Sequence, residues 1–113
     1  MRTRILLLVL FVVACSNPLD NSRDVRYKVT STASEVDITF VNGSGDTVQN
    51  NGVEPPWEIS FGADVGDFVY VSAQMMEGGD HSVTVTIYSD GHTFESNTST
   101  GPYAIATASG TLD

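Results

Sequence analysis

The chain contains a single cysteine, Cys15, so it cannot form a disulfide within itself. Basic residues are also scarce, with 5 Lys and Arg against 14 Asp and Glu. Two of the basic residues, Arg2 and Arg4, lie at the N-terminus, so the rest of the chain has three basic and 14 acidic residues and a net charge of −11. Such a domain is repelled by nucleic-acid phosphates and by anionic lipid headgroups, which argues against nucleic acid as a partner.

Helical patterning is missing as well. No segment places three apolar residues at helical spacing between capping residues, which argues against a helical domain. Charged residues make up only 17% of the chain, and Ser, Thr, Gly and Asn take their place. The 113 residues are enough for one domain. This composition is more typical of an exported β-sandwich than of a cytosolic helical protein.

The N-terminus has the features of an export signal. Basic residues precede an unbroken apolar run from Ile5 to Val13. A helix of nine residues spans only ~14 Å, about half of a bilayer core, so this run is too short to cross a membrane.

The apolar run ends in Val12-Val13-Ala14-Cys15, which resembles the lipobox of bacterial lipoproteins. The resemblance implies cleavage after Ala14 and transfer of a diacylglyceryl group to the sulfur of Cys15. Two or more acyl chains anchor a protein to a membrane almost irreversibly. The next residue is Ser16 and not Asp, which favours the outer membrane if the cell is Gram-negative. The sequence thus predicts an exported, lipid-anchored protein.

Three parts of the chain follow from this pattern. Residues 1–14 are the predicted signal peptide, residues 15–24 the lipidated cysteine with a polar tether, and residues 25–113 the folded domain. The nine tether residues after Cys15 span at most ~30 Å when extended, so the domain is expected to stay close to its membrane.

Apolar and polar residues alternate through most of residues 25–113, which predicts β-strands. Asp90-Gly91 is a strong signal for a two-residue hairpin turn. Pro55-Pro56 marks a strand start or an edge strand. Phe68 to Ala73 is apolar on both faces, which predicts a central strand covered on both sides. Seven or eight short antiparallel strands predict an all-β, immunoglobulin-like β-sandwich.

Several ordered segments resemble the C-terminal domain of the MmpS family, small mycobacterial membrane proteins that assist MmpL transporters. The resemblance runs from about Val25 to Gly110 and implies a β-sandwich that is accessory to a membrane exporter. The matching segments are Glu54-Pro-Pro-Trp57, Tyr70-Val-Ser-Ala-Gln74, Val83-Thr-Val-Thr-Ile87 leading to Asp90-Gly91, and Gly101-Pro-Tyr-Ala104 through Ala106-Thr-Ala-Ser-Gly110.

The chain departs from that family at two points. Where the family has a pair of cysteines that form a disulfide, this chain has Val85 and Ala108, which we expect to face each other in the core. The family is anchored by a transmembrane helix, whereas this chain has the lipid signal at Cys15.

A few side chains are candidates for contact with a partner or ligand. Trp57 either fills the sandwich core or is an exposed aromatic residue that stacks on sugars or docks a partner. Met75 and Met76 form either an apolar spot at a loop tip or part of the core.

No constellation of catalytic or metal-binding residues stands out, and we predict no cofactor. His81 and His92 lack a third ligand for a metal site. Asp64, Asp67 and Asp80 lie in predicted turns, where aspartate is common for its own hydrogen bonds, and their spacing lacks the calcium-loop signature. No Gly-x-Ser-x-Gly elbow or phosphate-binding loop occurs, which argues against an enzyme. The sequence favours a non-catalytic envelope domain for binding or scaffolding, with an integral membrane transporter as a partner. The alternative is a module that binds carbohydrate or calcium.

Overall fold

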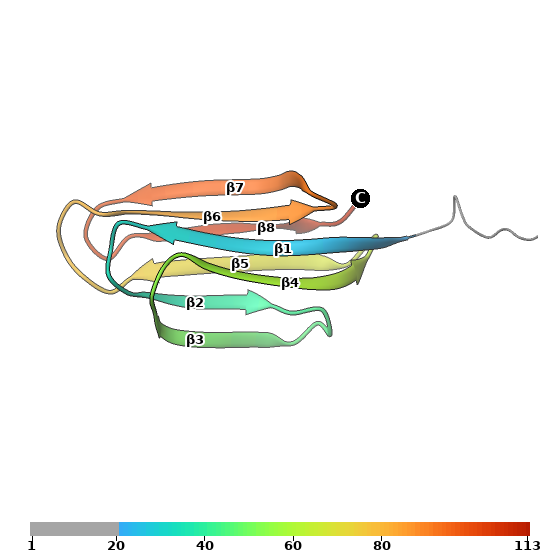
Figure 1. The fold of residues 1–113 in the computed structure, drawn as a ribbon, viewed down its shortest axis with the longest axis horizontal. Helices are drawn as coiled ribbons and strands as arrows, with labels where there is room; N and C mark the ends of the chain where they lie inside the picture. The colour runs from blue at the N-terminus through green and yellow to red at the C-terminus, as the bar shows by residue number, and fades with distance from the viewer. Residues whose placement is uncertain (1–20) are drawn as a thin grey trace, which may run out of the picture.

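Eight β-strands form the regular structure of residues 21–113, the part of the chain that the computed structural model describes (Figure 1). Cys15, the predicted signal peptide and most of the predicted tether lie outside the described residues. The strands are β1 (Ser22–Ser31), β2 (Val36–Val41), β3 (Thr47–Val53), β4 (Trp57–Asp64), β5 (Phe68–Met75), β6 (Ser82–Ser89), β7 (His92–Thr100) and β8 (Ile105–Thr111). No helix within residues 21–113 is long and apolar enough to cross a membrane.

The strands form two four-stranded sheets, in the orders β4-β1-β6-β7 and β3-β2-β5-β8, and every pair is antiparallel. The two sheets pack face to face as an open sandwich. This confirms the predicted all-β sandwich of antiparallel strands and its number of strands.

The alternating residues supply the core between the sheets. All buried residues within the described part of the chain are apolar or aromatic, and none is charged. Val85 of β6 and Ala108 of β8 are both fully buried in opposing sheets, and that their side chains face each other stays a prediction. The core residues that are fully or almost fully enclosed include Val25, Tyr27, Val29, Val36, Ile38, Phe40, Val69, Val71, Ala73, Met75, Val83, Ile87 and Ala106.

Strand β5 corrects one expectation. It is central, between β2 and β8, as predicted. It is covered on one face only, because Val69, Val71 and Ala73 are buried while Phe68 is 54% exposed and Tyr70 is half-buried. A sandwich has two layers, so each sheet keeps one face toward solvent whatever its composition.

Strand β1 begins earlier than expected, which shortens the tether. Ser22 already pairs with Asp64 of β4. The backbone N–H of Asp24 donates to Asp90 Oδ1 over 2.8 Å, and the N–H of Asp90 donates to the carbonyl of Asp24 over 2.8 Å. The prediction that residues 22–24 belong to the tether is therefore wrong, because these cross-strand bonds draw them into the sheet.

Glycines with positive φ shape the backbone at two places in the fold. Asp90 and Gly91 both have positive φ and join β6 to β7, which confirms the predicted two-residue hairpin. Gly52 has a φ of 67° within β3, where the pairing with β2 shifts between Val36 and Ile38, so a bulge lets the strand continue.

The connections gather at two ends of the sandwich (Figure 1). At one end, which we call the tether end, β1 begins, the chain terminates, and the β2–β3, β4–β5 and β6–β7 turns lie. Arg23 Nε donates to the carbonyl of Asp113 there, over 3.2 Å. At the other end, the far end, the N–H groups of Gly101 and Tyr103 donate to the carbonyls of His81 and Glu77.

Candidate functional site

The two histidines lie at opposite ends of the sandwich. His81 precedes β6 and His92 follows it, so the eight residues of the strand, ~26 Å in length, separate them. His81 Nε2 lies 3.2 Å from Glu77 Oε2, and His81 Nδ1 lies 3.3 Å from Thr32 Oγ1. The two histidines are thus too far apart to share a metal ion.

Of the three aspartates considered for calcium, Asp80 is kept apart from Asp64 and Asp67. Asp67 lies at the start of β5 and Asp80 beyond its end. The carboxylate of Asp67 accepts a hydrogen bond from the N–H of Asp64 over 2.9 Å, so it stabilises its own turn. No group of three or more metal-ligating side chains occurs within residues 21–113.

Trp57 begins β4 and is half-buried. Its ring packs against Phe40, with 5.2 Å between ring centroids and 50° between the ring planes. One side of the indole therefore packs on the core, as the first alternative predicted. A contact role for its exposed side stays a prediction.

The two methionines have different surroundings. Met75 is fully buried as the last residue of β5, so it belongs to the core and is no longer a candidate contact residue. The next residue must point the other way along an extended backbone. Met76 is accordingly 45% exposed and stays a candidate.

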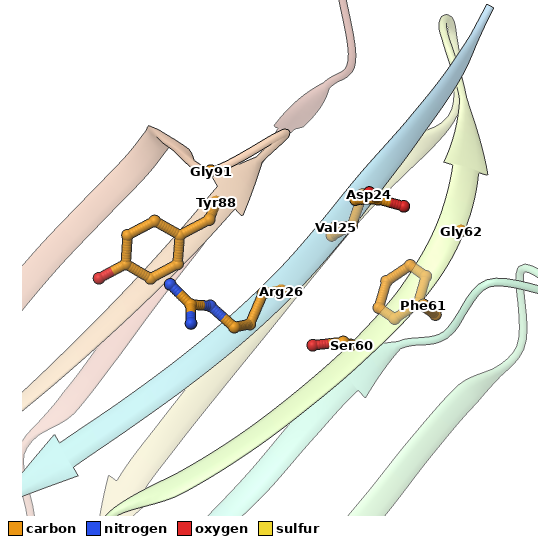
Figure 2. Close-up of a pocket in the computed structure, with 8 residues that line it drawn as sticks. All are labelled: Asp24, Val25, Arg26, Ser60, Phe61, Gly62, Tyr88 and Gly91. Carbon is orange, nitrogen blue, oxygen red and sulfur yellow. The ribbon is translucent and has the colours of Figure 1, made fainter.

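A groove of about 550 Å³ lies on the outer face of the β4-β1-β6-β7 sheet (Figure 2). Arg26 of β1 stands at its centre, because its cross-strand neighbours are Ser60 of β4 and Tyr88 of β6. The residues that line the groove are Asp24, Val25, Arg26, Ser60, Phe61, Gly62, Tyr88 and Gly91.

Tyr88 and Glu58 hold the Arg26 side chain in place. Arg26 Cζ lies 4.3 Å from the centroid of the Tyr88 ring, a cation–π contact, and Figure 2 shows the guanidinium directed toward that ring. Glu58 lies between two cations, with Oε1 3.9 Å from Arg26 Nη1 and Oε2 4.0 Å from Lys28 Nζ. These exposed ion pairs add little stability. They restrict where Arg26 points while leaving it N–H groups to offer to a ligand.

The chemistry of this groove suits binding. Arg26 supplies donors, Asp24 and Ser60 supply acceptors, and Tyr88 and Phe61 supply aromatic surface. No histidine lines the groove, so Ser60 has no imidazole there to act as its base.

The same face continues as a row of hydroxyl groups toward the β7 edge. Thr84 and Thr98 are joined through their Oγ1 atoms over 2.8 Å, and Thr86 Oγ1 lies 3.0 Å from Ser96 Oγ. These cross-strand pairs keep the outer face of β6 and β7 polar.

Sequence reasoning did not find this groove. Arg26 and Tyr88 are far apart in the sequence and meet only because β1 pairs with β6. The alternation of β1 does predict that Arg26 points outward. The sequence around Arg26 does not show which residues of other strands lie beside it.

The chain matches no known protein-family model, and no curated protein emerges as a relative. The likeness to the MmpS family thus gains no further support and remains an expectation.

Proposed function

We propose that this protein is a non-catalytic, lipid-anchored binding domain of a bacterial envelope. The groove around Arg26 is the observation that carries the proposal, because it joins a positioned guanidinium to acceptors and aromatic surface. A surface of this kind suits reversible binding of a partner or ligand.

The predicted anchor sets where this binding takes place. Six residues separate Cys15 from Ser22, the first residue of β1. Such a segment reaches at most ~24 Å when extended. A lipid on Cys15 would therefore keep the sandwich within one domain diameter of its membrane.

The first candidate partner is an integral membrane transporter for lipids or small molecules. It comes from the resemblance to the MmpS family and agrees with a domain confined to the membrane surface. In this case the groove would contact an exposed loop of the transporter.

The second candidate is a carbohydrate. The groove pairs the donors of Arg26 with the carboxylate of Asp24 and the ring of Tyr88. Sugar hydroxyls both donate and accept hydrogen bonds, and the apolar face of a sugar ring packs on aromatic side chains, so this set of groups suits a neutral glycan.

The anchor is tested by mass spectrometry of the protein purified from membranes. We expect a chain that begins at Cys15 and carries the mass of a diacylglyceryl group. The Cys15→Ala variant is expected to accumulate as uncleaved precursor or to appear in the soluble fraction. A free sulfur at Cys15, or a leader still attached, would overturn the proposal.

The groove is tested with Arg26→Ala and a matched control, Thr98→Ala, on the same outer face. Co-purification of one large transporter with the native protein and the control, but not with Arg26→Ala, supports the first candidate. A rise in melting temperature with defined glycans that Arg26→Ala alone abolishes supports the second. If Arg26→Ala behaves like the control in both assays, the groove is not the binding site.

A further inference from the structure

Two neighbouring strands of the β3-β2-β5-β8 sheet contain no charged residue. These are β5 and β8, which pair along their full length. Four of the five large apolar side chains most exposed within residues 21–113 lie on these strands or directly beyond their far ends. We call this set, together with half-buried Tyr70, the apolar strip: Phe68, Tyr70, Met76, Tyr103 and Ile105.

The register shows that the strip lies on the outer face of the sheet. Val69 and Ala106 are buried, so the alternate positions Phe68, Tyr70 and Ile105 face outward. From Phe68 to Met76 the chain advances ~26 Å, so the strip has an apolar part near each end of the sandwich, with Ser72 and Gln74 between them on the same face.

Polar contacts keep the far part of the strip exposed. Tyr103 has a φ of 55°, a conformation that bulky residues adopt only at a cost in free energy. Its N–H donates to the carbonyl of Glu77 over 3.1 Å, and its carbonyl accepts from Gln74 Nε2 over 3.4 Å. The ring is 55% exposed beside Met76 and Ile105, so the fold holds it in water rather than in the core.

The outer face of the β4-β1-β6-β7 sheet differs from the apolar strip because it carries basic residues. All three Lys and Arg residues of the described chain, Arg23, Arg26 and Lys28, belong to β1 in the other sheet. The two outer faces of the sandwich therefore differ, one with Arg26, Lys28 and the groove, the other with the apolar strip.

We infer that the apolar strip lies on the membrane that holds the lipid of Cys15, in contact with its interfacial region. The inference rests on the proposed lipid anchor. Aromatic residues prefer the membrane interface, and an uncharged face avoids the cost of bringing ions to it. Lying on this face would turn the groove around Arg26 away from the bilayer and toward other partners.

The short distance from the lipid anchor makes even a weak affinity for the bilayer sufficient to keep the apolar strip on the membrane. Only six residues separate Cys15 from β1, which limits the distance between them to ~24 Å, so the bilayer is present at a high effective concentration near the domain. Asp37 flanks the strip beside Gln74, and the domain is acidic overall. The strip is thus suited to zwitterionic lipid, because anionic lipid would repel the domain.

Fluorescent labels at single thiols test this inference on the native lipoprotein. The only natural cysteine is Cys15, whose sulfur carries the lipid, so an introduced cysteine is the one free thiol. We would label Ile105→Cys in the strip and Thr98→Cys on the opposite face with an environment-sensitive fluorophore. The lipidated proteins are then placed in phosphatidylcholine vesicles that contain spin-labelled lipid.

We expect several-fold stronger quenching by the spin-labelled lipid at position 105 than at position 98, with a blue-shifted emission at position 105 only. Equal quenching at both positions would overturn the inference while leaving the anchor intact. A position-105 label that is exposed in vesicles but shielded in native membranes would also overturn it, because the occupant would then be a protein. Absence of lipid on the purified protein would overturn the proposed function and this inference together, and mass spectrometry identifies that case separately.

Discussion

Replacement of Tyr27 by phenylalanine is expected to remove a hydroxyl that joins the two sheets. Tyr27 belongs to β1 and is completely buried. Its hydroxyl donates to the carbonyl of Val41 over 2.6 Å and accepts from the N–H of Tyr70 over 3.2 Å. The pairing of β2 with β5 ends at Phe40 and Val71. The hydroxyl of Tyr27 therefore connects the next residue of each strand, Val41 and Tyr70.

The Tyr27→Phe variant keeps the aromatic packing, in which the ring lies edge-on to Phe61 with centroids 5.1 Å apart. It leaves the carbonyl of Val41 and the N–H of Tyr70 without this partner. Unpaired buried groups of this kind cost about 1–3 kcal/mol, so we expect the free energy of unfolding to fall by that amount near neutral pH.

The difference between native protein and variant should also depend on pH. Burial raises the pKa of Tyr27 from 10.0 to about 12, although the hydrogen bond from the Tyr70 backbone opposes the rise. The stabilisation is complete below the unfolded pKa and is lost as the pH rises through the folded pKa. Two pH units correspond to about 3 kcal/mol, which the native protein should lose over this range and the variant should not.

Urea unfolding, followed by the fluorescence of the single tryptophan, measures both effects. The two stability curves should lie apart at about pH 8 and converge between about pH 10 and pH 12. Tyr103→Phe is the control, because that ring is exposed. A variant as stable as the native protein at neutral pH, or a gap that stays constant up to pH 12, would refute this account of Tyr27.

Three further predictions concern other parts of the sandwich. Gly110→Ala places a Cβ 2.7 Å from Phe94 Cε2, so we expect a loss of about 1–3 kcal/mol in urea unfolding, part of which Phe94→Leu should restore. Trp57→Ala should lower the melting temperature measured by circular dichroism, since the half-buried ring packs on the core, and an unchanged value would indicate a surface role. Hydrogen bonds from the Ser34 hydroxyl and N–H lower the pKa of Glu77, so this contact stabilises the far end above about pH 4.5 and is lost in acid. The protection of the Ser34 amide against exchange, relative to the unfolded chain at the same pH, should accordingly fall at low pH in the native protein, and already at neutral pH in Glu77→Gln.

Local patterning predicted most of the strands because their side chains alternate with period two. Val25, Tyr27 and Val29 face inward as their spacing indicates, and Asp90-Gly91 turns the chain as its dipeptide predicts. Errors arose where tertiary contacts decide the outcome. Ser22 joins β1 through its pairing with β4, although its own sequence is typical of a tether.

Sequence reasoning could not predict the candidate surfaces, because these surfaces also depend on tertiary contacts. Met75 and Met76 are adjacent and chemically alike, and only the direction of the strand makes one core and the other exposed. Arg26 meets Tyr88 through the pairing of β1 with β6.

The sequence by itself determined the strand-forming segments, the all-β class and the predicted export signal, because each depends on residues close together in the chain. The tertiary structure alone decided which strands are neighbours, and therefore that Arg26 and Lys28 share one outer face and the apolar strip lies on the other. Phe68 and Tyr70 illustrate the difference. Their apolar character is local, but whether a further layer covers them depends on how many sheets the whole chain can build.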